Sequence, residues 1–322
     1  MMKFLRRCFI LLLTLIIVID IGGSLYFHHV ALARSGVAED KAAVAQRMAQ
    51  RAPFLASWLD SILAPSRNGH SLLLDTFITT DDGRRLHAWY LPAHRSTPRT
   101  AILLHGYGTQ GLEMLHIGYL YHHHLGYNLL LPDLHAHGQS DGSYIRMGWL
   151  DRLDVLRWAS EAQVLFDNHP WIVVHGISMG AATAMMLSGD ELPEGVKAFV
   201  EDCGYTSVWD EFEIELQKRY GLPAFPLLHS SSALCRLLHG WSFGQASALR
   251  QVARCSRPML FIHGDSDDFV PTSMARPLYE AHHGVKELWL APEAGHADAF
   301  WMHPDEYRQQ VRAFLGECET LP

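Results

Sequence analysis

One stretch of the sequence predicts a strand, a sharp turn and a helix in direct succession. Residues 171–174 are apolar and rich in β-branched side chains, which favours a strand buried on both faces. Residues 181–187 are small and apolar, which favours a helix packed on the same sheet. Between them, Gly176 and Gly180 flank Ser178, because a returning helix passes its strand too closely for a Cβ at either position. Ser178 is therefore expected at a strained corner above the sheet edge.

The rest of the chain continues this alternation of strands and helices. After a predicted hairpin, formed by residues 72–79 and 86–91, short apolar runs alternate with helical segments that include 150–166 and 304–317. The predicted strands are residues 100–104, 128–131, 171–174, 197–201, 258–262 and 286–290. We therefore expect the α/β class, with a mostly parallel central sheet flanked by helices and with ligands at the carboxyl ends of its strands.

Composition narrows the possible functions. The 322 residues are 48% hydrophobic and 19% charged, which is enough for one sizeable domain, expected at residues 71–322. A net charge of −8, without a basic block beyond the N-terminus, argues against a nucleic-acid partner. The histidines are scattered without metal-site spacing, and the run at 122–124 is expected to be a solvated helix end, so no metal site is predicted. The widely spaced cysteines are expected to be free thiols, with a single disulfide among Cys203, Cys235, Cys255 and Cys318 as the alternative.

The N-terminal residues 1–34 are predicted to be a membrane anchor or a signal segment. Basic residues precede an apolar run, residues 8–19, which continues past Asp20 to residue 27 and is long enough to span a bilayer. The triplet 31–33 resembles a signal cleavage site, but it lies far beyond the main apolar run. We therefore expect an uncleaved anchor with the body outside the cytoplasm, and secretion after cleavage is the alternative.

Two further segments lie outside the regular alternation. Residues 35–70 are predicted to be a helical linker, broken at Pro53, whose apolar face packs on the body. Residues 205–254 are predicted to be a helical lid inserted over the sheet. From Trp209 to Phe243 the lid carries six aromatic residues, most of which are expected to form a small core of their own while the lid lines an acyl pocket.

A serine hydroxyl needs a base and an orienting acid before it can act as a nucleophile at neutral pH. His296 follows the predicted strand 286–290 and is the expected base. Asp267 follows the strand 258–262 and is the expected acid, because its place in the string G-x-x-D-x-x-V-P fits the usual geometry. The rival acids are Asp265 and Asp268 in the same loop and Asp202 at the end of the preceding strand.

An acyl-transfer site also needs donors for the oxyanion. The loop 105–108 follows a predicted strand, and the expected oxyanion hole consists of the backbone N–H groups of Tyr107 and Met179. The Tyr107 side chain is expected to be part of the pocket wall, and His105 a structural hydrogen-bonding group. The polar string 133–142 is expected to form a turn held by side-chain hydrogen bonds rather than a metal site.

From about Ser71 onwards the chain resembles the α/β-hydrolase superfamily, and specifically its anchored or exported bacterial serine hydrolases related to the serine aminopeptidase and prolyl-oligopeptidase-like branches. The resemblance lies in HGYG at 105–108, PDLHAHGQSDG at 132–142, HGISMG at 175–180, HGDSDDFVP at 263–271 and AGH at 294–296. In the family the middle string more often reads arginine-glycine-histidine-glycine. Here His135 and Ala136 replace its first two residues, which puts the shape of that turn in question.

The resemblance implies a serine hydrolase that acts through an acyl-enzyme, with the catalytic residues Ser178, Asp267 and His296. No cofactor is implied. The expected substrate is a small-molecule or acyl compound, most simply a carboxylic ester, because the least specialised members cleave esters and the lid is apolar. A peptidase or amidase of the same fold is the alternative, and a catalytically silent binding protein on this scaffold is a third hypothesis.

Overall fold

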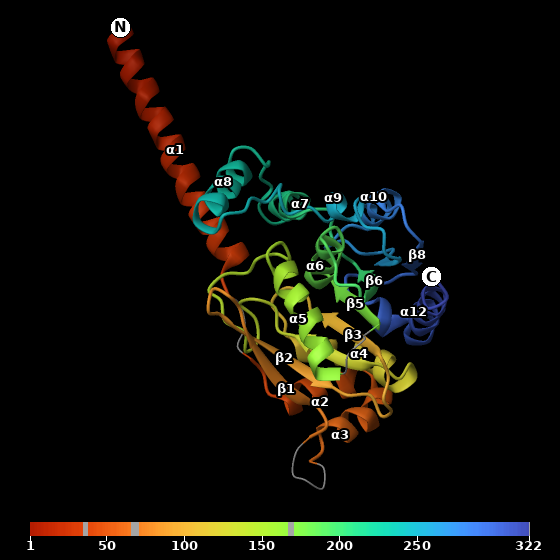
Figure 1. The fold of residues 1–322 in the computed structure, drawn as a ribbon. Coiled ribbons are helices and arrows are strands. Elements are labelled where there is room, and N and C mark those ends of the chain that lie inside the picture. The colour runs from red at the N-terminus through yellow and green to blue at the C-terminus, as the bar shows by residue number, and fades with distance from the viewer. Residues whose placement is uncertain (35–37, 66–70, 167–170, 322) are drawn as a thin grey trace.

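An eight-stranded sheet forms the centre of the structure, a computed structural model that describes residues 1–34, 38–65, 71–166 and 171–321 (Figure 1). The strand order is β1-β2-β4-β3-β5-β6-β7-β8. β1 and β2 are antiparallel, β2 also pairs antiparallel with β4, and the remaining pairs are parallel. The strands are β1 (Leu74–Thr79), β2 (Arg85–Leu91), β3 (Arg99–Leu104), β4 (Asn128–Pro132), β5 (Trp171–Ile177), β6 (Val196–Asp202), β7 (Met259–Gly264) and β8 (Lys286–Ala291). The predicted fold class is confirmed.

Helices cover both faces of this sheet, because its central strands are apolar on both sides. Along β5, Ile172 and Val174 face one hydrophobic cluster while Val173 and Ile177 face the other. The first cluster is covered by α5 (Asp151–Phe166), α6 (Met179–Ser188), α9 (Ala248–Val252), the turn η4 (Thr272–Met274) and α10 (Ala275–Ala281). The second is covered by the turn η2 (Gly111–Met114), α4 (Leu115–Tyr119), η3 (Leu120–His124), α11 (Ala299–Met302) and α12 (Pro304–Cys318).

The predicted strand 171–174 proves three residues too short. β5 continues to Ile177, because its pairing with β6 runs on from His175 opposite Val200 to Ile177 opposite Asp202. The extension brings the turn that holds Ser178 directly to the carboxyl edge of the sheet.

The helical linker packs against the body, as its apolar face predicts. It consists of α2 (Lys41–Arg51), the turn η1 (Pro53–Leu55) and α3 (Ala56–Leu63), while residues 35–37 and 66–70 of the predicted linker lie outside the described residues. Four apolar side chains of the linker, those of Leu55, Trp58, Leu59 and Ile62, are buried in the second cluster.

The expectation of a solvated histidine run at 122–124 is wrong at one position. His122 is buried, and its Nδ1 accepts a hydrogen bond of 3.2 Å from the indole N–H of Trp58.

The lid region contains α7 (Val208–Tyr220) and α8 (Leu227–His239), followed by α9. α7 begins where the Ser207 hydroxyl accepts the N–H of Asp210, and it ends at Gly221, whose φ of +66° closes the helix in the left-handed conformation. Phe212, Trp241 and Phe243 form the aromatic core that the sequence predicts. Phe27 joins them from the N-terminal helix, with its ring centroid 5.4 Å from that of Phe212.

The N-terminal helix α1 (Met2–Leu32) projects from the body, and α8 lies beside its second half (Figure 1). Within the described residues it is the one helix long and apolar enough to cross a membrane. Its first half is exposed, whereas Ser24, Phe27 and Leu32 are buried against the body. At its end the Leu32 carbonyl accepts the N–H of Ile145 at 2.6 Å, so the helix terminus is joined to the loop that follows β4.

Candidate active site

Ser178 occupies the sharp turn between β5 and α6. Its φ of +56° and ψ of −118° are strained for a residue with a side chain, and its N–H donates to the Asp202 carbonyl at 2.8 Å. A Cβ added at Gly176 would overlap the Gly180 backbone, and one added at Gly180 would overlap the Leu104 carbonyl. The two glycines are therefore needed for the close approach that lifts the Ser178 hydroxyl above the sheet edge.

The predicted base and acid lie in one hydrogen-bonded row with this hydroxyl. The Ser178 Oγ lies 2.9 Å from Nε2 of His296, and Nδ1 of His296 lies 2.8 Å from a carboxylate oxygen of Asp267. His296 comes from the loop after β8, and Asp267 from the loop after β7. In the neutral imidazole, Nδ1–H donates to Asp267, which leaves Nε2 free to accept the serine proton.

Asp267 is held as a carboxylate by its surroundings. Burial alone would raise its pKa, but hydrogen bonds from His263 and His296 outweigh burial and lower the pKa of Asp267 to about 2. Its other oxygen accepts the backbone N–H groups of Phe269 and Val270, each at 3.0 Å. The carboxylate is thus charged at neutral pH and fixed in orientation. The support from His263 is a contact that the sequence pattern does not predict.

The rival acids have other surroundings. Asp265 accepts the backbone N–H of Glu293 at 2.7 Å and so braces a turn, and Asp268 is exposed. Asp202 is fully buried and accepts the hydroxyl of Tyr307 at 3.0 Å. Burial raises the pKa of Asp202 to about 6. The contact with His296 therefore belongs to Asp267 and to none of these three.

The loop 105–108 lies beside the nucleophile. A Cβ on Gly106 would be 3.5 Å from that of Ser178. Nε2 of His105 accepts the N–H of Leu134 at 2.9 Å, as expected for a structural hydrogen-bonding group. Met179 is the first residue of α6, so its N–H has no acceptor within the helix. Both backbone segments of the predicted oxyanion hole thus flank Ser178.

The Tyr107 side chain forms part of the wall of a pocket beside Ser178, as expected. Its hydroxyl donates to the carbonyl of Ala31, in the last turn of α1, at 3.2 Å. The last residue of the loop is held as well, because Nε2 of His137 accepts the N–H of Gly108 at 3.1 Å. The loop is therefore fixed from two sides, by α1 and by the turn after β4.

The string 133–142 forms the turn held by side-chain hydrogen bonds that its composition predicts. Asp133 accepts the N–H groups of Gly111 and Gln139 at 2.7 and 2.9 Å and pairs with His87 at 2.7 Å. Ala136 takes a φ of +62°, which is the left-handed region that favours glycine. Ala136 therefore holds a conformation in this turn that glycine adopts more easily.

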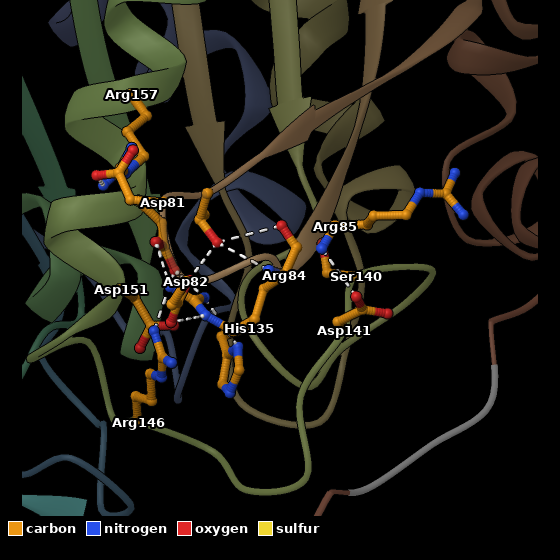
Figure 2. Close-up of polar contacts among 12 residues, drawn as sticks. Asp81, Asp82, Arg84, Arg85, His135, Ser140, Asp141, Arg146, Asp151 and Arg157 are labelled. Atoms are coloured by element: carbon orange, nitrogen blue, oxygen red, sulfur yellow. Dashed lines mark hydrogen bonds and ion pairs between the residues drawn. The ribbon is translucent and has the colours of Figure 1, made fainter.

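A group of ion pairs lies beside this turn and joins it to the body (Figure 2). Arg84 donates to both oxygens of Asp154 at 3.1 and 3.3 Å and to Asp82 at 2.7 Å. Arg146 donates to the same Asp154 at 3.2 Å, and His135 lies 3.3 Å from Arg84. Burial lowers the pKa of His135, and the nearby guanidinium groups of Arg146 and Arg84 lower it further, to about 3. His135 therefore stays neutral, as a structural residue.

Two hollows meet at Ser178. The first holds about 130 Å³ and has largely aromatic and aliphatic walls. It is lined by Phe27, Val30, Ala31, Tyr107, Met147, Ser178, Met179, Tyr205, Glu211, Phe212, Glu215, Arg219, Tyr220, Phe269 and Val270. The second holds about 540 Å³ and reaches His296, with Arg51, Glu113 and Asp298 among its lining residues. The site thus has an apolar side and a more polar side, with the nucleophile between them.

Three residues of the apolar wall, Phe27, Val30 and Ala31, come from α1. The sequence predicts a pocket lined by the lid, and it does not predict that residues of α1 line the pocket as well. A helical pattern in an N-terminal segment reveals the helix but does not reveal which cavity its far end will reach.

Glu211 is a buried acidic residue of the apolar wall. Burial raises its pKa to about 8, and within the described residues its Oε2 atom has no hydrogen-bond partner. Its carboxyl is therefore protonated at neutral pH, which keeps that part of the pocket uncharged.

Glu211→Gln is expected to stabilise the protein increasingly as pH rises. An unfolded glutamate releases its proton near pH 4.5, whereas folded Glu211 keeps it to about pH 8. The free energy of unfolding therefore falls as pH rises between these values, and the full loss is reached above about pH 8. Glutamine does not ionise and so avoids this loss. The melting temperature of Glu211→Gln should therefore exceed that of the parent by several degrees at about pH 9 and by less at about pH 5. The exposed Glu213→Gln is the control in thermal unfolding, and an equal difference at both pH values would contradict the assignment.

One group of described side chains is close enough together to consider a metal ion. The ligand atoms of Cys203, Asp267 and His296 lie within 4.8 Å of one another. Asp267 and His296, however, already bond to each other, and burial raises the pKa of the Cys203 thiol well above its ordinary value. A protonated thiol is a poor metal ligand, so this donor set fits proton transfer better.

Comparisons with known proteins agree with the fold. A family model described as alpha/beta hydrolase fold matches residues 101–228. The protein YqkD of Bacillus subtilis is 31% identical over 226 residues, which cover 70% of this chain and 74% of YqkD. The lysophosphatidylserine lipase ABHD12 of Macaca fascicularis is 24% identical over 72% of this chain and 59% of its own length. The solved esterase Pf2001 of Pyrococcus furiosus superposes with a TM-score of 0.62 at 25% identity, over 77% of this chain and 91% of the esterase.

Proposed function

Because this chain belongs to the α/β-hydrolase family, we propose that it is a serine hydrolase that cleaves carboxylic esters through an acyl-enzyme. The observation that carries the proposal is the hydrogen-bonded row from Ser178 through His296 to Asp267, with distances of 2.9 and 2.8 Å. Such a row supplies a nucleophile, a base and an orienting acid in the order that acyl transfer requires.

In the proposed mechanism, Ser178 attacks the acyl carbon while Nε2 of His296 takes its proton. Asp267, ionised because its pKa is about 2, stabilises the imidazolium through Nδ1–H. The N–H groups of Met179 and Tyr107 donate to the oxyanion of the tetrahedral intermediate, and each such donor contributes about 2.7–4 kcal/mol. His296 then protonates the leaving alcohol and activates the water that releases the acid.

Esters are favoured over amides by the pocket and by two relatives. The hollow beside Ser178 has mainly aromatic and aliphatic walls, which suit an acyl chain. Pf2001 is an esterase, and ABHD12 is a lipase that acts on lysophosphatidylserine. A peptidase or amidase of the same fold remains the second candidate function, since the proposed residues would also cleave amides.

A substrate panel tests the proposal. We expect turnover of p-nitrophenyl esters and at least 100-fold slower turnover of aminoacyl p-nitroanilides, because the apolar pocket offers little recognition of a peptide. A fluorophosphonate probe should label Ser178 in the same preparation, which separates a true hydrolase from a silent binding protein. Anilide turnover without ester turnover would reverse the choice between ester and amide, and the absence of labelling in folded protein would contradict catalysis by Ser178.

We further propose that α1 is an uncleaved membrane anchor and that the body lies outside the cytoplasm. Cleavage after Ala33 would remove three pocket-lining residues and the buried Leu32, whose carbonyl is bonded to Ile145. The basic residues at the N-terminus favour its retention in the cytoplasm. In fractionated cells the probe-labelled protein should therefore appear in the membrane pellet at the mass of the full chain.

A further inference from the structure

We propose that the substrate is an ester with a single long acyl chain that enters the pocket from the bilayer, between α1 and the lid helix α7. This inference rests on the proposed function and concerns where the substrate comes from and which part of the chain recognises it. Four features of the described residues support it. Residues of α1 line the apolar pocket, and the end of α1 is hydrogen-bonded to the loops around Ser178. The lid helix α8 packs on α1, and the site has an apolar side and a more polar side.

The membrane helix and the acyl pocket share residues. Phe27, Val30 and Ala31 of α1 line the same hollow as Ser178. A helix of 31 residues is about 46 Å long, whereas about 20 residues cross the hydrocarbon core of a bilayer. Counted from Arg7, the last of the N-terminal basic residues, such a span ends at about Phe27. The pocket wall therefore begins where α1 leaves the membrane.

The end of α1 is fixed to the catalytic centre. Ala31 accepts the hydroxyl of Tyr107, the residue whose N–H belongs to the proposed oxyanion hole. The guanidinium of Arg34 donates to the carbonyls of Gly138, Ser140 and Gly142 at 2.9–3.2 Å. The helix therefore cannot move away from Ser178 without breaking these bonds, and the distance between the bilayer surface and the nucleophile is set by the fold.

The lid helix α8 lies against α1 along about the last two turns of this span. Asp20, the acidic residue within the apolar run, accepts the hydroxyl of Ser230 on α8 at 3.0 Å. An ionisable residue within a membrane segment needs such a partner. Beside this contact the lid exposes large apolar side chains: Phe225 is 72% and Leu237 81% exposed. The helix α8, which carries Leu237, lies beside the exposed apolar helix α1 (Figure 1), so we infer that the bilayer covers these side chains.

The two hollows at Ser178 suit an amphiphile with one chain. The apolar hollow, at about 130 Å³, is small compared with drug-sized pockets of about 300–1,000 Å³, so it accommodates the carbons nearest the ester of one acyl chain rather than two chains. The other hollow, with Arg51, Glu113 and Asp298 among its lining residues, offers charged groups for a polar alcohol. Cleavage breaks the bond between acyl carbon and ester oxygen, so that water supplies the hydroxyl of the acid and a proton to the alcohol.

The test uses the full chain reconstituted in phosphatidylcholine vesicles, with p-nitrophenyl acetate and p-nitrophenyl palmitate as probes. At a fixed bulk concentration, the palmitate rate should fall as more phosphatidylcholine is added, because dilution within the bilayer lowers the concentration that the enzyme meets. The acetate rate should not change. A palmitate rate that depends on bulk concentration alone would overturn entry from the bilayer.

Two variants test the shared wall and the lid contact. The indole of Ala31→Trp should occupy part of the apolar hollow and lower the ratio of kcat/KM for palmitate to kcat/KM for acetate at least 10-fold. The control is Val18→Trp, on the exposed part of the same helix, which should leave both rates unchanged. Phe225→Asp should lower the ratio several-fold in vesicles. An unchanged ratio in Ala31→Trp, with acetate turnover proving that the protein is folded, would overturn the inference while sparing the proposed function. Absence of both ester turnover and probe labelling would overturn both.

Discussion

Ser178→Ala is expected to lower kcat for p-nitrophenyl butyrate by about 10⁶-fold, the scale observed when the nucleophile of a Ser-His-Asp triad is removed. The reason is that, among the residues that the structure describes, Ser178 is the one whose hydroxyl lies within hydrogen-bond distance of Nε2 of His296, at 2.9 Å. Alanine leaves the neighbouring oxyanion donors and pockets in place, so a residual rate above that of water is expected. The measurement is steady-state hydrolysis together with labelling by a fluorophosphonate probe.

Ser266→Ala is the matched control for this variant. Ser266 is exposed in the loop that carries Asp267, and it contacts Asp265 rather than the base. Its replacement should leave kcat within about twofold and labelling intact. A Ser178→Ala protein that is folded and still hydrolyses butyrate at the parental rate would rule out the acyl-enzyme at this serine.

Asp267→Asn is expected to lower kcat by about 10⁴-fold with little change in KM. An asparagine amide can donate to Nδ1 of His296, which would stabilise the tautomer that has its proton on Nε2, and that tautomer cannot accept the proton of Ser178. The measurement is kcat and KM for butyrate across pH, with folding checked by circular dichroism.

Three further variants distinguish the rival acids. Asp265→Asn and Asp268→Asn should remain within a few-fold of the parent, since one braces a turn and the other is exposed. Asp202→Asn perturbs a buried hydrogen bond from Tyr307 and should act on stability more than on kcat. A fully active Asp267→Asn enzyme beside an inactive Asp202→Asn enzyme would move the acid to the end of β6.

Much of the architecture could be read from local patterns. The apolar, β-branched run at 171–174 specified a buried strand, and the glycines around Ser178 specified the tight turn after it. The helix boundaries at α5 and α12 differ from the predictions by one residue at most. Such features depend on neighbours in the chain, so the sequence carries them directly. The error at the end of β5 has the opposite origin, because pairing with β6 prolonged a strand whose own apolar run had ended.

The sequence by itself determined the α/β class, the corner that holds Ser178, and the loops from which its partners come. Only the tertiary structure decided which of four aspartates meets His296, that His122 is buried beneath Trp58, and that the end of α1 closes the acyl pocket. The physical reason is the range of the interactions involved. Backbone propensity and hydrophobic period act over a few residues, whereas the contact between Ser178 and His296 spans 118 positions and exists only once the sheet has aligned the strand ends.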